Sequence, residues 1–199
     1  MDTFLPLILG YLLGSIPFGL VITKVAGLGD IRQIGSGNIG ATNVLRTGRK
    51  DLALATLLLD GGKGAIAVAV AYYAGLRPEI AGAAAFLGHC FPVWLKFNGG
   101  KGVATFLGTL FALHWPAGLF VGATWLGVAK VGRISSLSAL VAAAASPLIL
   151  FTMGKVAFAF AALFMAVLIF IRHKTNIARL LAGTEPRIGD KKSAASTAS

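Results

Sequence analysis

The sequence predicts an all-α integral membrane protein with about seven transmembrane helices. Its 199 residues suit a single domain. Hydrophobic residues make up 56% of the chain and the mean hydropathy is +0.81, whereas soluble domains contain about 45–50% apolar residues. The apolar residues fall in long runs, and most positive charges fall in alternate loops between those runs. Composition and charge distribution therefore agree on the class.

Seven apolar runs are the candidate spans, because about 20 apolar residues cross roughly 30 Å of hydrocarbon. The fourth and fifth runs are short and are separated by Trp115-Pro116, and a proline limits helix continuation. These two could instead form one bent or re-entrant unit, so five or six spans also fit. The predicted helices lie near residues 3–23, 51–75, 79–95, 103–114, 116–130, 135–153 and 155–171.

The positive charges test this arrangement. Seven helices alternate their connecting loops between two sides of the membrane, and fifteen of the eighteen Lys and Arg residues then fall on one side. The exceptions are Lys63, inside a helix, and Arg77 and Lys155 on the other side. By the positive-inside rule the N-terminus is outside, and the loop 24–50 and the C-terminus are cytoplasmic. Because topology explains the net charge of +11, no nucleic-acid partner is expected.

We expect one transmembrane domain over residues 1–185 and a disordered cytoplasmic tail over residues 186–199, since the tail is small, polar and without periodicity. The first residues, Met1-Asp2-Thr3, lack the basic region of a secretory signal, so the first apolar run is expected to stay in the bilayer. A single cysteine, Cys90, excludes an internal disulfide framework. No obligate protein partner is evident.

A first polar stretch, GSGNIGATN at residues 35–43, combines flexible glycine backbone with small polar side chains. Glycines let successive N–H groups turn toward one point, as in phosphate-binding loops. The stretch also fits G-x-G-x-x-G, but a dinucleotide fingerprint follows a strand and this stretch follows a membrane helix. A plain flexible loop is the alternative. The candidate anion ligands are Ser36, Asn38, Thr42, Asn43 and Arg46.

A second polar stretch, FNGGKGVAT at residues 97–105, places glycines at the start of a predicted helix. Orphan N–H groups at that helix end and the charge of Lys101 favour an anion. It is not a nucleotide P-loop, because Leu95 and Gly102 stand where that motif needs a glycine and a Ser or Thr. A basic turn that reaches lipid headgroups is the alternative. The candidates are Gly99, Gly100, Lys101, Gly102 and Thr105.

A third polar stretch, RHKTNIARLLAGTE at residues 172–185, continues the last membrane helix into the cytoplasm. On a helix His173 and Asn176 share a face, and Arg179 is the neighbour of Asn176 three residues on. These three residues could line one rim, with Glu185 in support. A basic juxtamembrane helix touching anionic lipid is the alternative. Since all three stretches fall on the cytoplasmic side, we expect them to form one polar pocket.

Asp60 and Lys63 are one turn apart inside the predicted helix 51–75. Ionisable residues at such depth usually pair and face the bundle interior. We expect an ion pair in a structural or supporting role.

Common catalytic patterns are absent from the sequence. It contains no H-x-x-x-x-D motif, no G-x-S-x-G elbow and no metal-ligand cluster, and its only histidines are His89, His114 and His173. The adjacent His89 and Cys90 cannot face each other on a helix. We therefore expect no metal and no cofactor. A reaction would depend on binding and charge stabilisation, with His173 as the candidate protein base on the polar face.

These motifs, in this order, resemble the bacterial acyl-phosphate:glycerol-3-phosphate acyltransferase family. The resemblance covers nearly the whole chain up to about Arg187. It is carried by GSIPFG (14–19), GSGNIGATN, the Asp60 and Lys63-Gly64 pair, GHCFPV (88–93), FNGGKGVAT and RHKTNIARLLAGTE.

The resemblance implies a seven-helix enzyme of the cytoplasmic membrane with an outside N-terminus. It implies transfer of a fatty acyl group from acyl phosphate to the 1-hydroxyl of sn-glycerol 3-phosphate, which gives lysophosphatidic acid and phosphate. The substrates would be acyl phosphate and glycerol 3-phosphate, and the GGKG region is associated with the latter. We hypothesise that Lys101 and Arg46 hold its phosphate, that Ser36, Asn38, Thr42 and Asn43 orient hydroxyls or the second phosphate, and that a substrate phosphate oxygen takes the proton in preference to His173.

Two other functions fit parts of the pattern. A transporter of a phosphorylated metabolite would suit glycine loops and buried charge, but the sequence shows no duplicated halves. A lipid-binding scaffold would explain the basic face but not the clustered Asn, Thr and Gly residues.

Overall fold

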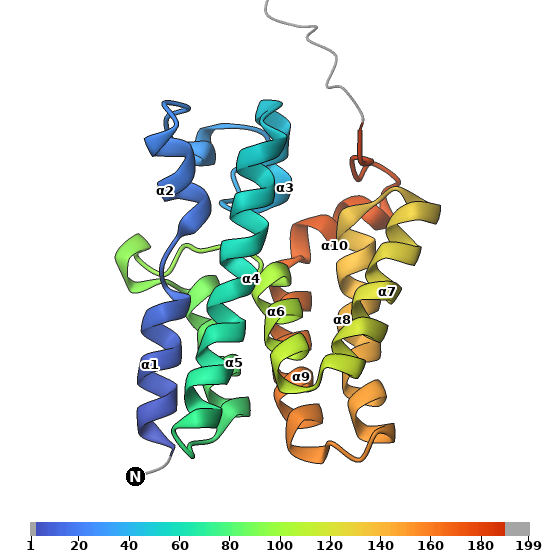
Figure 1. The fold of residues 1–199 in the computed structure, drawn as a ribbon. Coiled ribbons are helices and arrows are strands. Elements are labelled where there is room, and N and C mark those ends of the chain that lie inside the picture. Colours follow the sequence, from blue (N-terminus) through green and yellow to red (C-terminus); the bar gives the residue numbers. More distant parts are fainter. Residues whose placement is uncertain (1–2, 190–199) are drawn as a thin grey trace, which may run out of the picture.

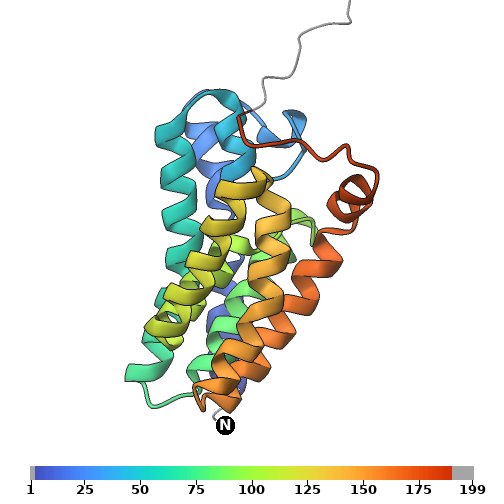
Figure 2. The ribbon, with the colours of Figure 1, turned by 90° about the vertical axis from the view of Figure 1, so that its right-hand side faces the viewer.

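The computed structural model describes residues 3–189, and these residues form helices and no strand. The longer helices lie side by side as a bundle (Figure 1), and the view turned by 90° shows the same roughly common direction (Figure 2). The α-helices are α1 (Phe4–Gly14), α2 (Phe18–Val25), α3 (Ala41–Val44), α4 (Lys50–Tyr73), α5 (Pro78–Cys90), α6 (Val103–Leu113), α7 (Trp115–Gly132), α8 (Ser135–Thr152), α9 (Val156–Arg172) and α10 (Lys174–Leu181). Three short 3-10 helices are η1 (Ile31–Gln33), η2 (Leu45–Thr47) and η3 (Val93–Leu95).

Every predicted apolar run contains a helix, but the first run is broken and the third is shorter than predicted. The first run is broken between α1 and α2, because Pro17 has no N–H and disfavours helical backbone at Ile16. The third ends at Cys90, because Pro92 acts in the same way on Phe91, whose φ and ψ are −135° and 60°. The fourth and fifth runs are separate helices, α6 and α7, joined through His114.

Three segments within residues 3–189 are long and apolar enough to cross a membrane: Phe4–Val25, Lys50–Tyr73 and Ser135–Thr152. α9 and α10 would add a fourth as one unit bent by 63°. The stretch after the last membrane helix is helical, as predicted, but α10 turns away from α9 at His173. The count of seven spans remains a prediction.

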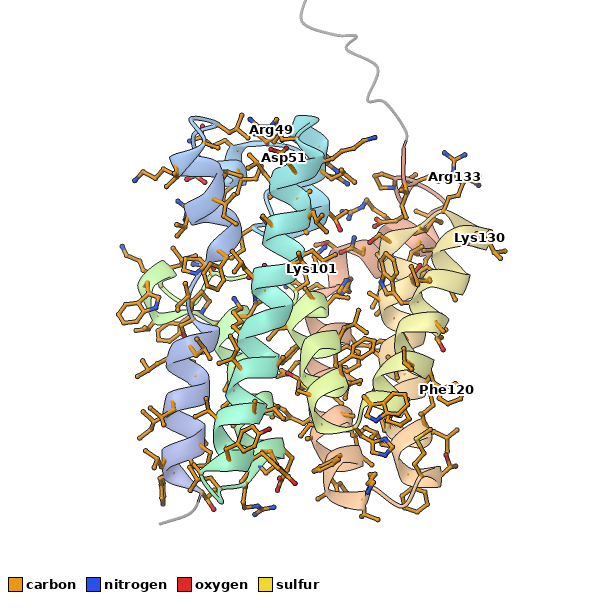
Figure 3. All side chains as sticks on the ribbon, in the orientation of Figure 1. Arg49, Asp51, Lys101, Phe120, Lys130 and Arg133 are labelled. Carbon is orange, nitrogen blue, oxygen red and sulfur yellow. The ribbon has the colours of Figure 1, made fainter. Side chains whose placement is uncertain are left out.

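The two ends of the bundle differ in the residues they carry. The N-terminus, the α4–α5 turn and the α8–α9 turn lie at one end, and the connection from α2 to α4 and the α7–α8 turn lie at the other (Figure 1). Arg49, Asp51, Lys130 and Arg133 are labelled at this second end in Figure 3. Two of the loops predicted to be cytoplasmic thus share one end of the molecule, whereas Lys101 of a third lies nearer mid-height (Figure 3).

The predicted tail lies largely outside the described residues. Only residues 186–189 of the segment 186–199 are described, and there Ile188 and Arg133 exchange hydrogen bonds: the Ile188 N–H donates to the Arg133 carbonyl at 2.6 Å, and Arg133 Nη2 donates to the Ile188 carbonyl at 3.0 Å.

Apolar packing holds the second half of the bundle together. Phe86, Phe106, Leu110, Met165 and Ile169 belong to one buried cluster contributed by α5, α6 and α9. Large apolar side chains also cover the outside of the helices, such as Phe120 of α7, which is 59% exposed and points away from the bundle in Figure 3. Apolar residues on both faces are typical of a helix bundle in lipid.

Small residues bring α1 and α5 into close contact. A Cβ atom built on Gly14 would lie 2.0 Å from the carbonyl oxygen of Ala85, and one on Gly10 would lie 2.3 Å from that of Ala81. Gly10 and Gly14 form a G-x-x-x-G pair, and Ala81 and Ala85 repeat the same spacing on the facing helix. Such pairs let membrane helices approach closely enough for extensive van der Waals contact.

We predict that Gly14→Ala destabilises the protein by about 1–3 kcal/mol, the usual cost of overpacking a close contact. The measurement is the midpoint of thermal unfolding in detergent. Gly62→Ala is the matched control, because a Cβ on Gly62 of α4 meets nothing within 4 Å and alanine favours a helix. Equal midpoints for Gly14→Ala and the wild-type protein would show that α1 can shift without cost.

Candidate active site

Asn43 organises the first polar loop. Its Nδ2 lies 2.9 Å from the carbonyl oxygens of Ile31 and Ile34 and 2.8 Å from that of Asn38. Its Oδ1 accepts the backbone N–H of Ser36 at 2.9 Å. Asn43 is buried, with 2% of its surface exposed. The predicted ligand is therefore the internal brace of the loop, and its hydrogen-bonding capacity is used within the protein.

Ser36, Thr42 and Arg46 remain exposed on the loop that Asn43 braces. The side chain of Arg46 lies over Gly35, where a Cβ atom would be 2.8 Å from Cδ of Arg46. Asn38 is half-buried, and its Oδ1 accepts the N–H of Gly40 within the loop at 3.0 Å. The loop therefore offers one guanidinium and two hydroxyls to a ligand.

Both the N–H and the carbonyl groups of the second loop are held by hydrogen bonds. The N–H groups of Gly99 and Gly100 donate to the carbonyls of Cys90 and His89, at 3.2 and 3.1 Å. The guanidinium of Arg172 donates to the carbonyls of the same two glycines, through Nη2 to Gly99 at 2.7 Å and through Nε to Gly100 at 3.1 Å. The amide groups of Gly99 and Gly100 are thus occupied inside the protein.

Close packing explains the glycines themselves. A Cβ atom on Gly100 would lie 2.1 Å from Nε2 of His89, so the ring and the loop could not both keep their places. Gly102 has a φ of 82°, which disfavours a side chain. The loop ends at Gly102 and α6 begins at Val103, with the side chain of Lys101 between α4 and α10 (Figure 3).

A hydrogen-bonded chain joins the second loop to the third stretch. Lys101 Nζ donates to Oδ1 of Asn176, and Nδ2 of Asn176 donates to Oε1 of Glu185 at 2.5 Å. The same oxygen of Glu185 accepts the hydroxyl of Ser136 at 2.7 Å. Arg179 Nε donates to Oε2 of Glu185 at 2.6 Å. One carboxylate therefore gathers groups from α8, α10 and, through Asn176, the second loop.

The electrostatic surroundings of Lys101 include charges from the other two polar stretches. Burial lowers the pKa of Lys101 to about 8; the charge of Glu185 opposes this shift, and Arg179, Arg172 and Arg46 add to it. Burial raises the pKa of Glu185, but hydrogen bonds from Ser136, Asn176 and Arg179 outweigh burial and hold that pKa below its usual value. Cations from all three polar stretches thus act on one another.

His173 sits at the bend between α9 and α10 and is 3% exposed. Its Nδ1 lies 2.8 Å from the carbonyl oxygen of Ile169. Because a carbonyl only accepts, Nδ1 carries the proton and Nε2 keeps a free lone pair in the neutral ring. Burial lowers the pKa of His173 to about 4, so the ring is neutral at physiological pH.

Thr105, Asp60 and Lys63 lie in the interior. The hydroxyl of Thr105 is fully buried and donates to the backbone carbonyl of Asp60 at 2.8 Å, which ties α6 to α4. The predicted ion pair is present, with 2.9 Å between Lys63 Nζ and Asp60 Oδ1.

Known proteins match this fold and this set of residues. A sequence profile described as Glycerol-3-phosphate acyltransferase matches residues 4–183. The chain belongs to this family. Proteins named Glycerol-3-phosphate acyltransferase from Maricaulis maris and Paramagnetospirillum magneticum are 63% and 65% identical to it over 186 and 185 residues; both alignments cover 92% of this chain, and they cover 86% and 92% of the two relatives.

Solved structures of a glycerol-3-phosphate acyltransferase share the fold. PlsY (YgiH), described as an integral membrane glycerol 3-phosphate acyltransferase, superposes in its glycerol 3-phosphate form with a TM-score of 0.89 at 42% identity, over 95% of this chain and 96% of that chain. Its lysophosphatidic acid form gives a TM-score of 0.87 at 41% identity, with the same coverage. The resemblance seen in the sequence is confirmed.

Three supporting residues of this glycerol-3-phosphate acyltransferase were not assigned a role from the sequence. Arg172 holds the second loop, Ser136 binds Glu185, and the ring of His89 packs under Gly100. In the sequence, Arg172 was one of the fifteen positive charges that indicated the cytoplasmic side. Ser136 carried no signal, because its partner is 49 residues away.

We predict that Asn43→Ala loosens the first loop of this acyltransferase. The substitution leaves three carbonyls and the Ser36 amide without their partner, at a net cost of about 1 kcal/mol for each hydrogen bond. Amide hydrogen exchange over residues 35–40 should rise at least about tenfold. The control is Thr42→Ala, one position away on an exposed side chain, which should leave exchange unchanged. Equal exchange in both variants would contradict the bracing role.

Proposed function

We propose that this protein transfers a fatty acyl group from acyl phosphate to the 1-hydroxyl of sn-glycerol 3-phosphate. The products are lysophosphatidic acid and inorganic phosphate. The observation that carries the proposal is the joined set of Lys101, Asn176, Glu185 and Arg179, which holds two half-buried cations. The charge of Arg46 on the first loop also acts on Lys101. Family membership and the two ligand forms named for PlsY support it. Neither favours the transporter or the scaffold.

The phosphate of glycerol 3-phosphate would bind Lys101 and Arg46. Lys101 already donates to a neutral amide, so its charge is not matched by a carboxylate in direct contact. Arg46 is exposed and can pair with phosphate in the bidentate geometry of a guanidinium. Ser36 and Thr42 would orient hydroxyls or the second phosphate, and Asn176 and Arg179 would complete the rim. Asn38, Asn43 and Thr105 are assigned to support of the loops.

The chemistry needs little activation. The 1-hydroxyl oxygen attacks the carbonyl carbon of acyl phosphate, a tetrahedral centre forms, and the bond between carbon and the phosphate oxygen then breaks. The leaving group departs as phosphate and carries the bonding electrons, while the hydroxyl proton passes to a phosphate oxygen. Because the amides of Gly99 and Gly100 are occupied, stabilisation of the developing charge falls to Lys101 and to the first turn of α6, whose amides have no intrahelical acceptors.

The membrane setting is part of the proposal. We infer seven spans in the bacterial cytoplasmic membrane, an outside N-terminus, and a pocket that opens toward the cytoplasm at the boundary with lipid. The positively charged end of the bundle supports this orientation. An acyl donor held in the bilayer could then meet a water-soluble acceptor at this boundary.

The test is a reconstituted assay. The purified protein in lipid vesicles receives acyl phosphate and glycerol 3-phosphate without coenzyme A, and phosphate and lysophosphatidic acid are both measured. Equal amounts of the two products are expected. Acyl-coenzyme A in place of acyl phosphate is the donor control and should give none. Absence of both products with acyl phosphate would overturn the proposal, and product from acyl-coenzyme A alone would overturn the assigned donor.

We predict that kcat/KM for glycerol 3-phosphate falls as pH rises above about 8, because kcat/KM reports free-enzyme groups and the pKa of Lys101 is lowered to about 8 by burial. Below that pH the amino group is charged and binds phosphate; above it the charge is lost. Lys101→Arg stays charged, so its remaining activity should be flat up to about pH 9.5. An equal decline of kcat/KM with pH in the wild type and in Lys101→Arg would show that Lys101 does not bind the phosphate.

We predict that His173→Asn retains turnover within about tenfold of the wild type between about pH 6 and 9, since general-base catalysis contributes about 100-fold to 10,000-fold where it operates. Asparagine can still donate to the Ile169 carbonyl but has no basic nitrogen. His173→Ala also removes the hydrogen bond to the Ile169 carbonyl. A loss of turnover in His173→Ala alone would therefore report on the structure of the bend and not on proton transfer. A loss of several orders of magnitude in His173→Asn would show that the ring is the base and that proton transfer to phosphate does not suffice.

A further inference from the structure

The ion pair of Asp60 and Lys63 contacts residues that lead to each of the two polar loops. Both side chains are almost fully buried, at 2% and 1% exposed. A buried ion pair is often no more stabilising than apolar residues of the same volume, and charges inside membrane helices usually mark function. The contacts of this pair with the rest of the molecule suggest what that function is.

Lys63 contacts the break in the first membrane segment. Its Nζ donates to the carbonyl oxygen of Ile16 at 2.8 Å. This carbonyl precedes Pro17, lies where α1 has ended and α2 has not begun, and also accepts the N–H of Phe18 at 3.1 Å. The ring of Phe18 lies 5.7 Å from the same Nζ. Pro17 sets the break, and Lys63 holds the backbone on either side of it through Ile16 and Phe18.

α2 transmits this position to the first polar loop. A Cβ atom on Gly19, in the first turn of α2, would lie 1.9 Å from the carbonyl oxygen of Ile39. Ile39 is buried in the middle of the loop that Asn43 braces. With so little space between the two backbones, a shift of α2 must move the loop and with it Ser36 and Arg46.

Asp60 faces the second loop. Its Oδ1 lies 3.6 Å from Nδ1 of His89, and the His89 ring packs directly under Gly100, one residue before Lys101. The carbonyl of His89 also accepts the N–H of Gly100 at 3.1 Å. At the other end of that loop, the Asp60 carbonyl accepts the hydroxyl of Thr105. Asp60 therefore contacts residues that flank the second loop on both sides.

We propose that Asp60 and Lys63 are positioning residues that set the spacing between Arg46 on the first loop and Lys101 on the second. Lys63 acts through Ile16 and α2, and Asp60 acts through His89 and Gly100. Neither residue touches substrate. The inference rests on the proposed function, because the spacing that it explains is the one across which the phosphate of glycerol 3-phosphate would bind.

The test is the double variant Asp60→Asn/Lys63→Met. Each single variant leaves one buried charge unpaired and should lose stability, whereas the double variant keeps both shapes and removes both charges. It is expected to unfold near the wild-type temperature, yet kcat/KM for glycerol 3-phosphate should fall at least about tenfold, with KM raised, because small displacements of binding groups are costly. Lys155→Met is the control, since Lys155 is exposed at the far end of the bundle and should leave the kinetics unchanged.

Normal kinetics in a stably folded double variant would overturn the proposal. If the double variant does not purify, the kinetics of Gly19→Ala are measured instead. This substitution forces α2 away from Ile39 and leaves the ion pair intact. Unchanged kinetics in Gly19→Ala would equally overturn the proposal. Amide exchange separates this inference from the proposed function. Exchange in residues 35–43 and 97–102 should rise together in the double variant even if the wild-type protein makes no lysophosphatidic acid, and unchanged exchange in both loops would count against positioning.

Discussion

The site depends on one carboxylate that keeps several cations together. The charges of Arg46, Arg172 and Arg179 disfavour the charged form of Lys101, which burial disfavours further, because like charges repel more strongly where water is excluded. Glu185 offsets part of this repulsion by binding Arg179 directly and Lys101 through Asn176. Since one negative charge faces several positive ones, the group remains cationic and suits a phosphate-bearing ligand. The same carboxylate anchors Ser136, which links the charge balance to the packing of α8.

Neither polar loop depends on substrate for its shape. Asn43 satisfies the backbone of the first loop from inside, and Arg172 and the His89 carbonyl satisfy that of the second. Glycines allow these close approaches, as at Gly100 over the His89 ring. Loops held in this way can present their cations with little reorganisation, which is the condition under which charge stabilisation lowers a barrier most. The glycines of the first loop thus serve its folding, and the exposed Ser36, Thr42 and Arg46 are the side chains proposed to meet the ligand.

Sequence reasoning found what depends on local pattern and missed what depends on distant partners. Apolar runs located the helices, and the spacing of Asp60 and Lys63 predicted their ion pair. Small polar residues beside a cation located the second and third segments, which Lys101 and Asn176 join. Pro17 and Pro92 were visible but were not used to end helices, although residues before proline disfavour helical backbone. Asn43 and Thr105 were taken for ligands because the type of a polar side chain does not reveal whether it points into the loop or out of it. Arg172 and Ser136 bind residues tens of positions away, and such pairs cannot be recognised in a single sequence.

The placement of Asn176 between Lys101 and Glu185 has a chemical consequence. A lysine in direct contact with a carboxylate would be neutralised, and a phosphate would have to displace that carboxylate before binding. Through the amide, Lys101 keeps a hydrogen-bond acceptor that is weaker than an anion, and its pKa stays near 8 because burial disfavours its charge. If the substrate phosphate binds Lys101 as proposed, it favours the charged form and raises this pKa, so that substrate and proton would bind to Lys101 cooperatively. The amide of Asn176 holds the amino group in position without neutralising it, and the proposed phosphate would be its first anionic contact.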